Sequence, residues 1–397
     1  MRPAQPTSAT SATLALGLGT LVSHGFGLAL VPAFLPGIED TFQSGFTALG
    51  GAVGLGLLTY ATGGFLASRV LDWLPNRTVL NTTFVLTAIA LLGAAVAPSA
   101  TIIALPVMLL GLAAPISWAA TTHVAARSVD AGRRGLVMGG ASAGVGLGVI
   151  VNGGLVRLYS DPGAWRSAFL VAGVISLLVT VSSLLVFRHT IERPSEAGNS
   201  AVPSGSYREV LSHWAGRVVV VGSAIAGVTS YTFTTFLTAT AFDTMGASAT
   251  AAGALFWLMG SIGIVASISL GRLGDRRSPT LLVAAMFLVA GIGFGILTSV
   301  WSYPALALAS LSIAILNYPI WGMVATVATN RFDASAALTA VSMGLVGASS
   351  LSAIASLLAG SWFDRVGSMR IPIGILAVLA IVTGGWLLRV HGSRVAD

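Results

Sequence analysis

The chain has 397 residues, of which 55% are hydrophobic and 8% are charged, and it contains twenty arginines, no lysine and no cysteine. An average soluble domain has about 25% charged residues, so this composition excludes a protein that faces water on all sides and predicts an integral membrane protein. The lack of cysteine excludes disulfides and thiolate metal sites. The net charge of +7 comes from arginines scattered in turns, which fits a membrane protein better than a nucleic-acid-binding face.

The N-terminal tail is polar, and Arg2 is its only charged residue before a long uncharged run over 3–38. That run is too long for the apolar core of a signal peptide and has no clear small-residue cleavage site. We therefore interpret residues 1–13 as a tail that leads into the first spanning helix.

Uncharged runs divide the rest of the chain into candidate spans. They are 3–38, 41–68, 78–126, 135–156, 167–187, 218–242, 244–271, 278–330, 334–363 and 371–388. A spanning helix needs about 20 apolar residues, so eight runs are single spans. The runs 78–126 and 278–330 are double, with breaks at Ala97-Pro98-Ser99 and near Ser302-Tyr303-Pro304, because proline and small polar residues end helices. The sequence predicts an all-α membrane protein with twelve transmembrane helices.

A polar segment from Arg188 to Arg217 divides these helices into two groups of six. Its proline, glycine and serine content is typical of a linker. We expect an N-terminal six-helix bundle over 1–190, a cytoplasmic linker over 191–214 and a C-terminal six-helix bundle over 215–397. Within the linker, Tyr207 to His213 is a candidate short surface helix.

Landmarks of the first half recur in the second half at an offset of 204 residues. Pro115-Ile116 matches Pro319-Ile320, Arg127 matches Arg331, and Trp165-Arg166 matches Met369-Arg370. Duplicated halves are common in secondary transporters, so the offset predicts two pseudo-symmetric bundles.

The arginines predict the orientation of the chain. With both termini in the cytoplasm, sixteen arginines lie in inner loops and tails and four lie in outer loops: Arg157, Arg166, Arg365 and Arg370. This asymmetry favours cytoplasmic termini. The bias toward alanine, glycine and arginine is typical of a bacterium with GC-rich DNA, so we expect the bacterial cytoplasmic (inner) membrane.

Two arginine-bearing turns resemble each other and a known signature. Gly271-Arg272-Leu273-Gly274-Asp275-Arg276-Arg277 and the shorter Gly64-Phe65-Leu66-Ala67-Ser68-Arg69 resemble the loop signature of the major facilitator superfamily of transporters. In that family the glycine permits close helix packing, and the acid and arginines hold an inner gate shut. The resemblance implies gate roles for six residues: Gly64, Arg69, Asp72, Gly271, Asp275 and Arg276. Ser68 replaces the usual acid in the first copy, with Asp72 as its possible substitute.

Other family traits are mixed. Trp165-Arg166-Ser167-Ala168-Phe169 looks like the entry to the sixth span of many members. The fifth span resembles a glycine-rich antiporter signature, through Gly144, Gly146, Gly148, Asn152, Gly153 and Gly154. Val149 and Asn152 depart from that signature, and small residues also occur where helices pack in lipid. We take the pattern as favouring export.

The resemblance implies a substrate cavity between the first, fourth, seventh and tenth spans. Candidate lining residues are His24, Phe26, Trp118, Thr121, Thr122, Tyr231, Thr234, Asn317, Tyr318 and Trp321, with Trp257 of the eighth span as a further candidate. Several aromatic residues without a central charge suit a neutral, weakly polar or amphipathic organic solute. The alternative for each aromatic residue is lipid contact or interface anchoring.

No aspartate or glutamate lies in the middle of any span, although proton-coupled transporters commonly place a carboxylate there. His24 and His123 are the candidate proton-coupling residues, because an imidazole titrates near neutral pH. His123 lies close to the cytoplasmic end, where gating is an alternative. Glu39, Asp40 and Asp243 at the outer ends of spans are alternative proton sites or merely solvated ends.

Together these features predict a secondary active transporter, not an enzyme, that moves a small organic solute by alternating access with proton coupling. Efflux is the leading direction, and uptake by symport or uniport is the alternative. A non-transporting membrane sensor or membrane enzyme is a further alternative. We expect no cofactor, no metal site and no nucleic-acid partner. The expected partners are a small-molecule substrate, the proton and the lipid bilayer, and we expect a monomer.

Overall fold

The computed structural model describes the chain except for residues 1–8, 129–133, 162, 188–206, 275 and 396–397. The described part is helical and contains no strand. Twelve of its helical segments are long and apolar enough to cross a membrane, which confirms the predicted number. The membrane-crossing helices that form single elements are α4 (Gly45–Trp73), α5 (Asn76–Ala95), α6 (Ala100–Ser128), α7 (Arg134–Leu158), α8 (Trp165–Val186), α12 (Ala249–Gly274), α13 (Pro279–Ser299), α16 (Ala334–Val366) and α17 (Arg370–Val395).

Both double-length runs break where the sequence predicts. α5 ends at Ala95 and α6 begins at Ala100, on either side of the predicted break at Pro98. In the second run α13 ends at Ser299, and the next helix begins at Tyr303 with Pro304 in its first turn. Proline is tolerated in the first turn because the N–H that it lacks would have no partner there.

Three spans depart from a regular α-helix. The first comprises α1 (Ala9–Thr20), the π-helix η1 (Leu21–Phe26) and α2 (Gly27–Ala33), followed by α3 (Leu35–Phe42). The seventh is α10 (Trp214–Thr235), followed by α11 (Leu237–Ala239) and the π-helix η3 (Thr240–Thr244). The tenth breaks between α14 (Tyr303–Asn317) and α15 (Ile320–Thr329), next to Pro319.

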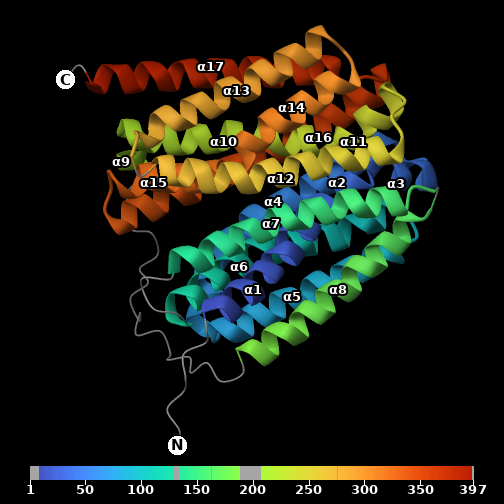
Figure 1. Ribbon diagram of the computed structural model, residues 1–397, viewed down its shortest axis with the longest axis horizontal. Helices are drawn as coiled ribbons and strands as arrows, with labels where there is room; N and C mark the ends of the chain where they lie inside the picture. The colour runs from blue at the N-terminus through green and yellow to red at the C-terminus, as the bar shows by residue number, and fades with distance from the viewer. Residues whose placement is uncertain (1–8, 129–133, 162, 188–206, 275, 396–397) are drawn as a thin grey trace, which may run out of the picture.

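The helices form two groups that pack side by side, α1–α8 and α10–α17 (Figure 1). We call the end at which α1 and α10 begin the linker-proximal end, and the end that holds α3 and η3 the linker-distal end. Two helix pairs make most of the contact between the groups, α4 with α16 and α7 with α12. The predicted surface helix is present as α9 (Tyr207–Ser212), whereas most of the predicted linker lies outside the described residues.

Helix starts repeat between the halves. α4, α5, α6 and α8 begin at Gly45, Asn76, Ala100 and Trp165, and α12, α13, α14 and α17 begin 204, 203, 203 and 205 residues later. A side-chain contact repeats as well. Arg166 donates a 2.7 Å hydrogen bond to the carbonyl oxygen of Ala95, and Arg370 donates one of 3.3 Å to that of Ser299. The donor and the acceptor of the second contact each lie 204 positions after those of the first, so the predicted pseudo-symmetry is present in the fold.

Glycine brings α7 and α12 together at backbone distance. A Cβ atom at Gly153 would lie 2.4 Å from the carbonyl oxygen of Gly253, and one at Gly146 would lie 2.9 Å from that of Gly260. Real Cβ atoms do not approach other atoms so closely, so these crossings require glycine. In lipid no hydrophobic effect drives helices together, and small residues allow the close van der Waals packing that replaces it.

Candidate functional site

His24 lies in the π-helical turn η1, in the middle of the first span. π-Helices are rare and occur frequently at functional sites. The imidazole ring meets two aromatic rings of its own half edge-on, with centroid distances of 5.5 Å to Trp118 and 6.3 Å to Tyr60. Its Nδ1 lies 3.0 Å from the hydroxyl oxygen of Ser23. These contacts from η1, α4 and α6 fix the ring toward the interior of the first half.

The second half presents a matching aromatic pair. Tyr231 of α10 and Trp321 of α15 stack with a centroid distance of 6.1 Å and an interplanar angle of 13°. Each half thus contributes one group of aromatic rings. We call the set His24, Tyr60, Trp118, Tyr231 and Trp321 the aromatic cluster.

Two more of the predicted lining residues, Asn317 and Tyr318, lie at the break between α14 and α15. The Tyr318 ring packs against α12, because a Cβ atom at Gly263 would fall 2.4 Å from the ring atom Cδ2. The side-chain carbonyl oxygen of Asn317 is buried and has no hydrogen-bond partner. An unpaired buried acceptor is costly, so this oxygen would be stabilised by a group that donates a hydrogen bond to it.

The remaining predicted lining residues lie elsewhere. Phe26 is fully buried, two positions beyond His24 and thus on a different side of the same turn. The Thr122 hydroxyl donates to the carbonyl oxygen of Ala119 in its own helix. Trp257 is 52% exposed and lies beside Gly153 at the α7–α12 crossing. His123 is exposed near the end of α6.

Thr121 and Thr234 are predicted lining residues whose hydroxyl oxygens are buried without a hydrogen-bond partner. Tyr60 is the cluster member that the sequence does not single out, because it lies in the second span and not in the four spans that the family resemblance assigns to the cavity. One feature of the sequence could have indicated Tyr60. It lies four residues before Gly64, the first residue of an arginine-bearing turn, and this spacing places both residues on one face of α4.

At the linker-distal end the two halves are joined by hydrogen bonds. The Thr238 hydroxyl of the second half donates a 2.7 Å bond to the carbonyl oxygen of Pro32 in the first half. The Asp364 carboxylate at the end of α16 accepts bonds of 2.7 and 2.8 Å from the backbone amides of Phe46 and Thr47. These contacts close the linker-distal end.

The α7–α12 pair separates toward the linker-proximal end, as the two ribbons show in Figure 1. Gly139 of α7 and Gly271 of α12 lie in that part of the pair, and a Cβ atom at either would have no neighbour within 4 Å. The α4–α16 pair stays closer, because a Cβ atom at Gly64 would lie 2.8 Å from Cδ2 of Leu345.

The other gate candidates that the structure describes, Arg69, Asp72 and Arg276, lie at the linker-proximal end. Arg69 places its guanidinium carbon 5.2 Å from the centroid of the Phe65 ring. Asp72 and Arg276 are exposed. Asp275 lies outside the described residues.

A family model described as the Major Facilitator Superfamily matches residues 16–351. The chain belongs to the major facilitator superfamily. It is therefore a multi-pass membrane transporter and not an enzyme, as the sequence predicts.

Solved structures of this superfamily have the same fold. A D-xylose–proton symporter matches at 15% identity over 95% of this chain and 97% of the other, with a TM-score of 0.76. A bacterial homologue of the human lysosomal transporter Spinster, inward-facing and unoccupied, matches at 15% identity over 98% and 97%, with a TM-score of 0.72. A mutant of the nucleoside transporter NupG matches at 12% identity over 95% and 99%, with a TM-score of 0.74.

Proposed function

We propose that this superfamily member is a secondary active transporter that moves a small, neutral, weakly polar organic solute by alternating access, coupled to protons. The aromatic cluster is the observation that supports this proposal most. It comprises a group of rings from each half, and no span has a central carboxylate. Aromatic surfaces with few polar groups suit ligands with an apolar face.

The polar groups of the predicted lining residues limit the chemical class of the solute. The unpaired oxygen of Asn317 accepts hydrogen bonds only, so we propose a solute with at least one hydroxyl or N–H donor. A carboxylate or phosphate substrate would call for an arginine near the middle of a span, and the sequence has none there. Phe26, Thr122 and Tyr318 then act as packing residues around the site.

For proton coupling we propose His24, with His123 as the alternative. His24 is 8% exposed and contacts two members of the aromatic cluster, Tyr60 and Trp118. A solute bound among these rings would therefore change the surroundings of the imidazole. Since an imidazole can bind and release a proton, solute binding and proton binding would be linked through direct contact.

The two moving bodies that we propose are residues 1–190 and 215–397, with 191–214 as the linker. The arginine asymmetry of the loops supports a cytoplasmic location for the linker-proximal end and both termini, in a bacterial inner membrane. In this orientation the closed linker-distal end faces outward. The gate residues of the linker-proximal end are Gly64, Arg69, Asp72, Gly271, Asp275 and Arg276.

Export is the direction that we propose. The glycine-rich helix α7, which resembles an antiporter signature, supports this direction. Glycines let α7 pack closely against both η1 and α12. At the crossing with η1, a Cβ atom at Gly148 would lie 2.7 Å from Cα of Gly25. Uptake is the alternative. The fold is similar to that of a D-xylose–proton symporter, so the test must distinguish uptake from export.

The test combines a ligand screen with transport by the purified protein as a monomer in liposomes. Compounds that raise the thermal stability are assayed for counterflow and for movement driven by a pH gradient. We expect His24→Ala to abolish gradient-driven movement while counterflow persists, and His123→Ala to leave both unchanged. The sign of the gradient that drives accumulation distinguishes export from uptake. Ligands that bind without any flux would contradict transport and favour a sensor.

A further inference from the structure

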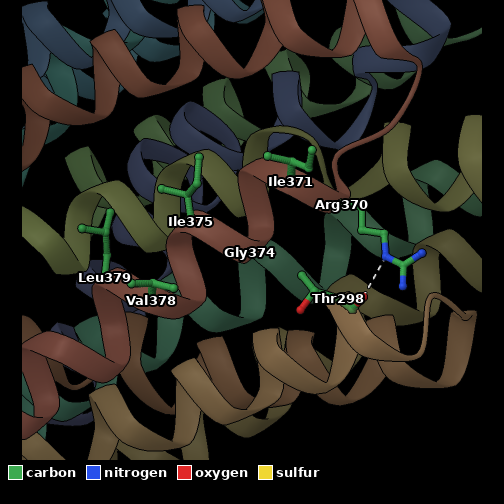
Figure 2. Close-up of a pocket in the computed structure, with 7 residues that line it drawn as sticks. All are labelled: Thr298, Arg370, Ile371, Gly374, Ile375, Val378 and Leu379. Carbon is green, nitrogen blue, oxygen red and sulfur yellow. Dashed lines mark hydrogen bonds between the residues drawn. The ribbon is translucent and has the colours of Figure 1, made fainter.

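A groove on the outside of the second half is lined by none of the residues of the aromatic cluster. It is formed by α13 and α17 and has a volume of about 540 Å³. Its lining residues are Thr298, Arg370, Ile371, Gly374, Ile375, Val378 and Leu379 (Figure 2). We propose that this groove binds one anionic phospholipid, with an acyl chain along α17 and the phosphate on Arg370.

The apolar part of the groove is suited to an acyl chain. Ile371, Ile375 and Val378 are 54%, 56% and 60% exposed, although they belong to a membrane-spanning helix. Their surroundings in the membrane are therefore lipid. Gly374 leaves a gap in this apolar row, since a Cβ atom there would meet only the methyl group of Thr298, at 3.7 Å. The result is a depression that runs along the helix axis, the direction of a lipid chain.

Arg370 marks the headgroup end of the groove. It is the first residue of α17 and is exposed, so it lies where the spanning segment reaches the membrane surface. Its Nε and one terminal nitrogen donate to the carbonyl oxygens of Thr298 and Ser299 at 2.7 and 3.3 Å. These bonds hold the guanidinium beside the groove, and a guanidinium has five N–H donors, so donors remain for a phosphate oxygen.

The duplicated half shows which part of this arrangement is structural. Arg166, the counterpart of Arg370, also donates to a carbonyl oxygen at the end of the third helix of its half. However, Arg166 is only partly exposed and packs on Trp165, with its guanidinium carbon 4.5 Å from the ring centroid. Met369 replaces that tryptophan in the second half. Arg370 thus keeps the shared hydrogen bond but has its other face open to the groove.

Charge complementarity selects the class of lipid. Arginine pairs with phosphate through parallel, charge-assisted hydrogen bonds. A zwitterionic lipid has the same chains but adds a cationic group next to the phosphate. We therefore infer a preference for phosphatidylglycerol over phosphatidylcholine.

The test measures the retention of lipid on the delipidated full-length protein by native mass spectrometry, with phosphatidylglycerol and phosphatidylcholine of identical chains. The wild type should prefer phosphatidylglycerol, and Arg370→Gln should lower that preference about fivefold. Arg370→Lys should keep most of it. Arg365→Gln removes an exposed arginine at the same end but outside the groove, so it should leave the preference unchanged.

A second pair of variants tests the acyl-chain part independently of the charge. Gly374→Leu fills the gap and should reduce retention of both lipids, whereas Gly385→Leu, on the same helix and outside the groove, should not. Equal retention of the two lipids by the wild type would overturn the proposal. Equal effects of Arg370→Gln and Arg365→Gln would also overturn it. The same holds if glycerol phosphate, which has no acyl chains, binds at the concentration at which the lipid binds.

Discussion

Asp364, two residues before the end of α16, accepts a 2.7 Å hydrogen bond from the backbone amide of Phe46, in the first turn of α4. The two residues are 318 positions apart in the chain and belong to different halves. The carboxylate satisfies amide groups that have no partner inside α4 and lies at the positive end of the helix dipole. This cross-half cap is part of the closure at the linker-distal end.

The first prediction concerns this cap. Asp364→Ala should favour states in which the linker-distal end is open, because losing a cap of this kind costs about 1–2 kcal/mol. The cysteine-free chain allows the opening to be measured at a single introduced thiol. Ser356→Cys is suitable, since Ser356 is fully buried where α4 and α16 cross. Its labelling should become faster in the Asp364→Ala background.

Asp333→Ala is the matched control for this prediction. Asp333 caps its own helix α16 through a 2.8 Å bond from the Ala336 amide, so its loss should lower stability without accelerating the labelling. Equal acceleration by both substitutions would show that labelling reports general loosening and not opening between the halves.

The second prediction concerns the α7–α12 crossing. Gly153→Val should reduce transport strongly and lower the free energy of unfolding by about 1–3 kcal/mol, because its side chain would collide with the carbonyl oxygen of Gly253. Gly154→Val is its control, since a Cβ atom at Gly154 meets nothing within 4 Å. Thermal denaturation and counterflow measure the two effects. Wild-type transport by Gly153→Val would contradict the close approach.

The third prediction concerns Tyr60, the cluster member whose ring centroid lies 6.3 Å from that of His24. Tyr60→Ala should weaken solute binding about tenfold, because aromatic contacts of this kind contribute about 0.5–1.5 kcal/mol beyond their buried area. Tyr60→Phe keeps the ring and should bind nearly as well. Binding is measured by thermal shift with a transported solute. Equal loss in both variants would assign the role to the hydroxyl group.

The fourth prediction is a pH dependence at the linker-distal end. Burial, together with Glu39 and Asp40, raises the pKa of Asp243 from 3.8 to about 6. A raised carboxyl pKa means that the folded state holds the proton more tightly than the unfolded state. The stability from this group is therefore greatest below 3.8 and is lost as the pH rises through about 6.

Asp243 belongs to the second half, and Glu39 and Asp40 belong to the first. Their mutual repulsion at higher pH therefore opposes closure. The labelling rate of Ser356→Cys, divided by that of the unfolded protein at the same pH to remove the pH dependence of the thiolate, should rise as the pH rises through about 6. Asp243→Asn should flatten this profile. A profile unchanged by Asp243→Asn would assign the pH dependence to another group.

The sequence predicted the twelve spans and their duplication because charges and prolines are excluded from most of a spanning helix and mark its ends. It could not predict which side of a span faces the interior. The first span is apolar on all sides. The periodicity of its sequence therefore does not distinguish His24, a member of the aromatic cluster, from the fully buried Phe26. Nor does any local pattern predict the π-helical turn η1 or the contact between Asp364 and Phe46, because both depend on tertiary packing.

The glycine crossing of α7 and α12 has a consequence for how this protein can change over time. The aromatic cluster and the backbones that touch at Gly153 and Gly253 are separate sets of residues. If the cluster binds the solute as proposed, substitutions in it can alter which compound is accepted without disturbing this crossing. The crossing itself tolerates almost no replacement, so it should vary little among descendants whose cargo has diverged.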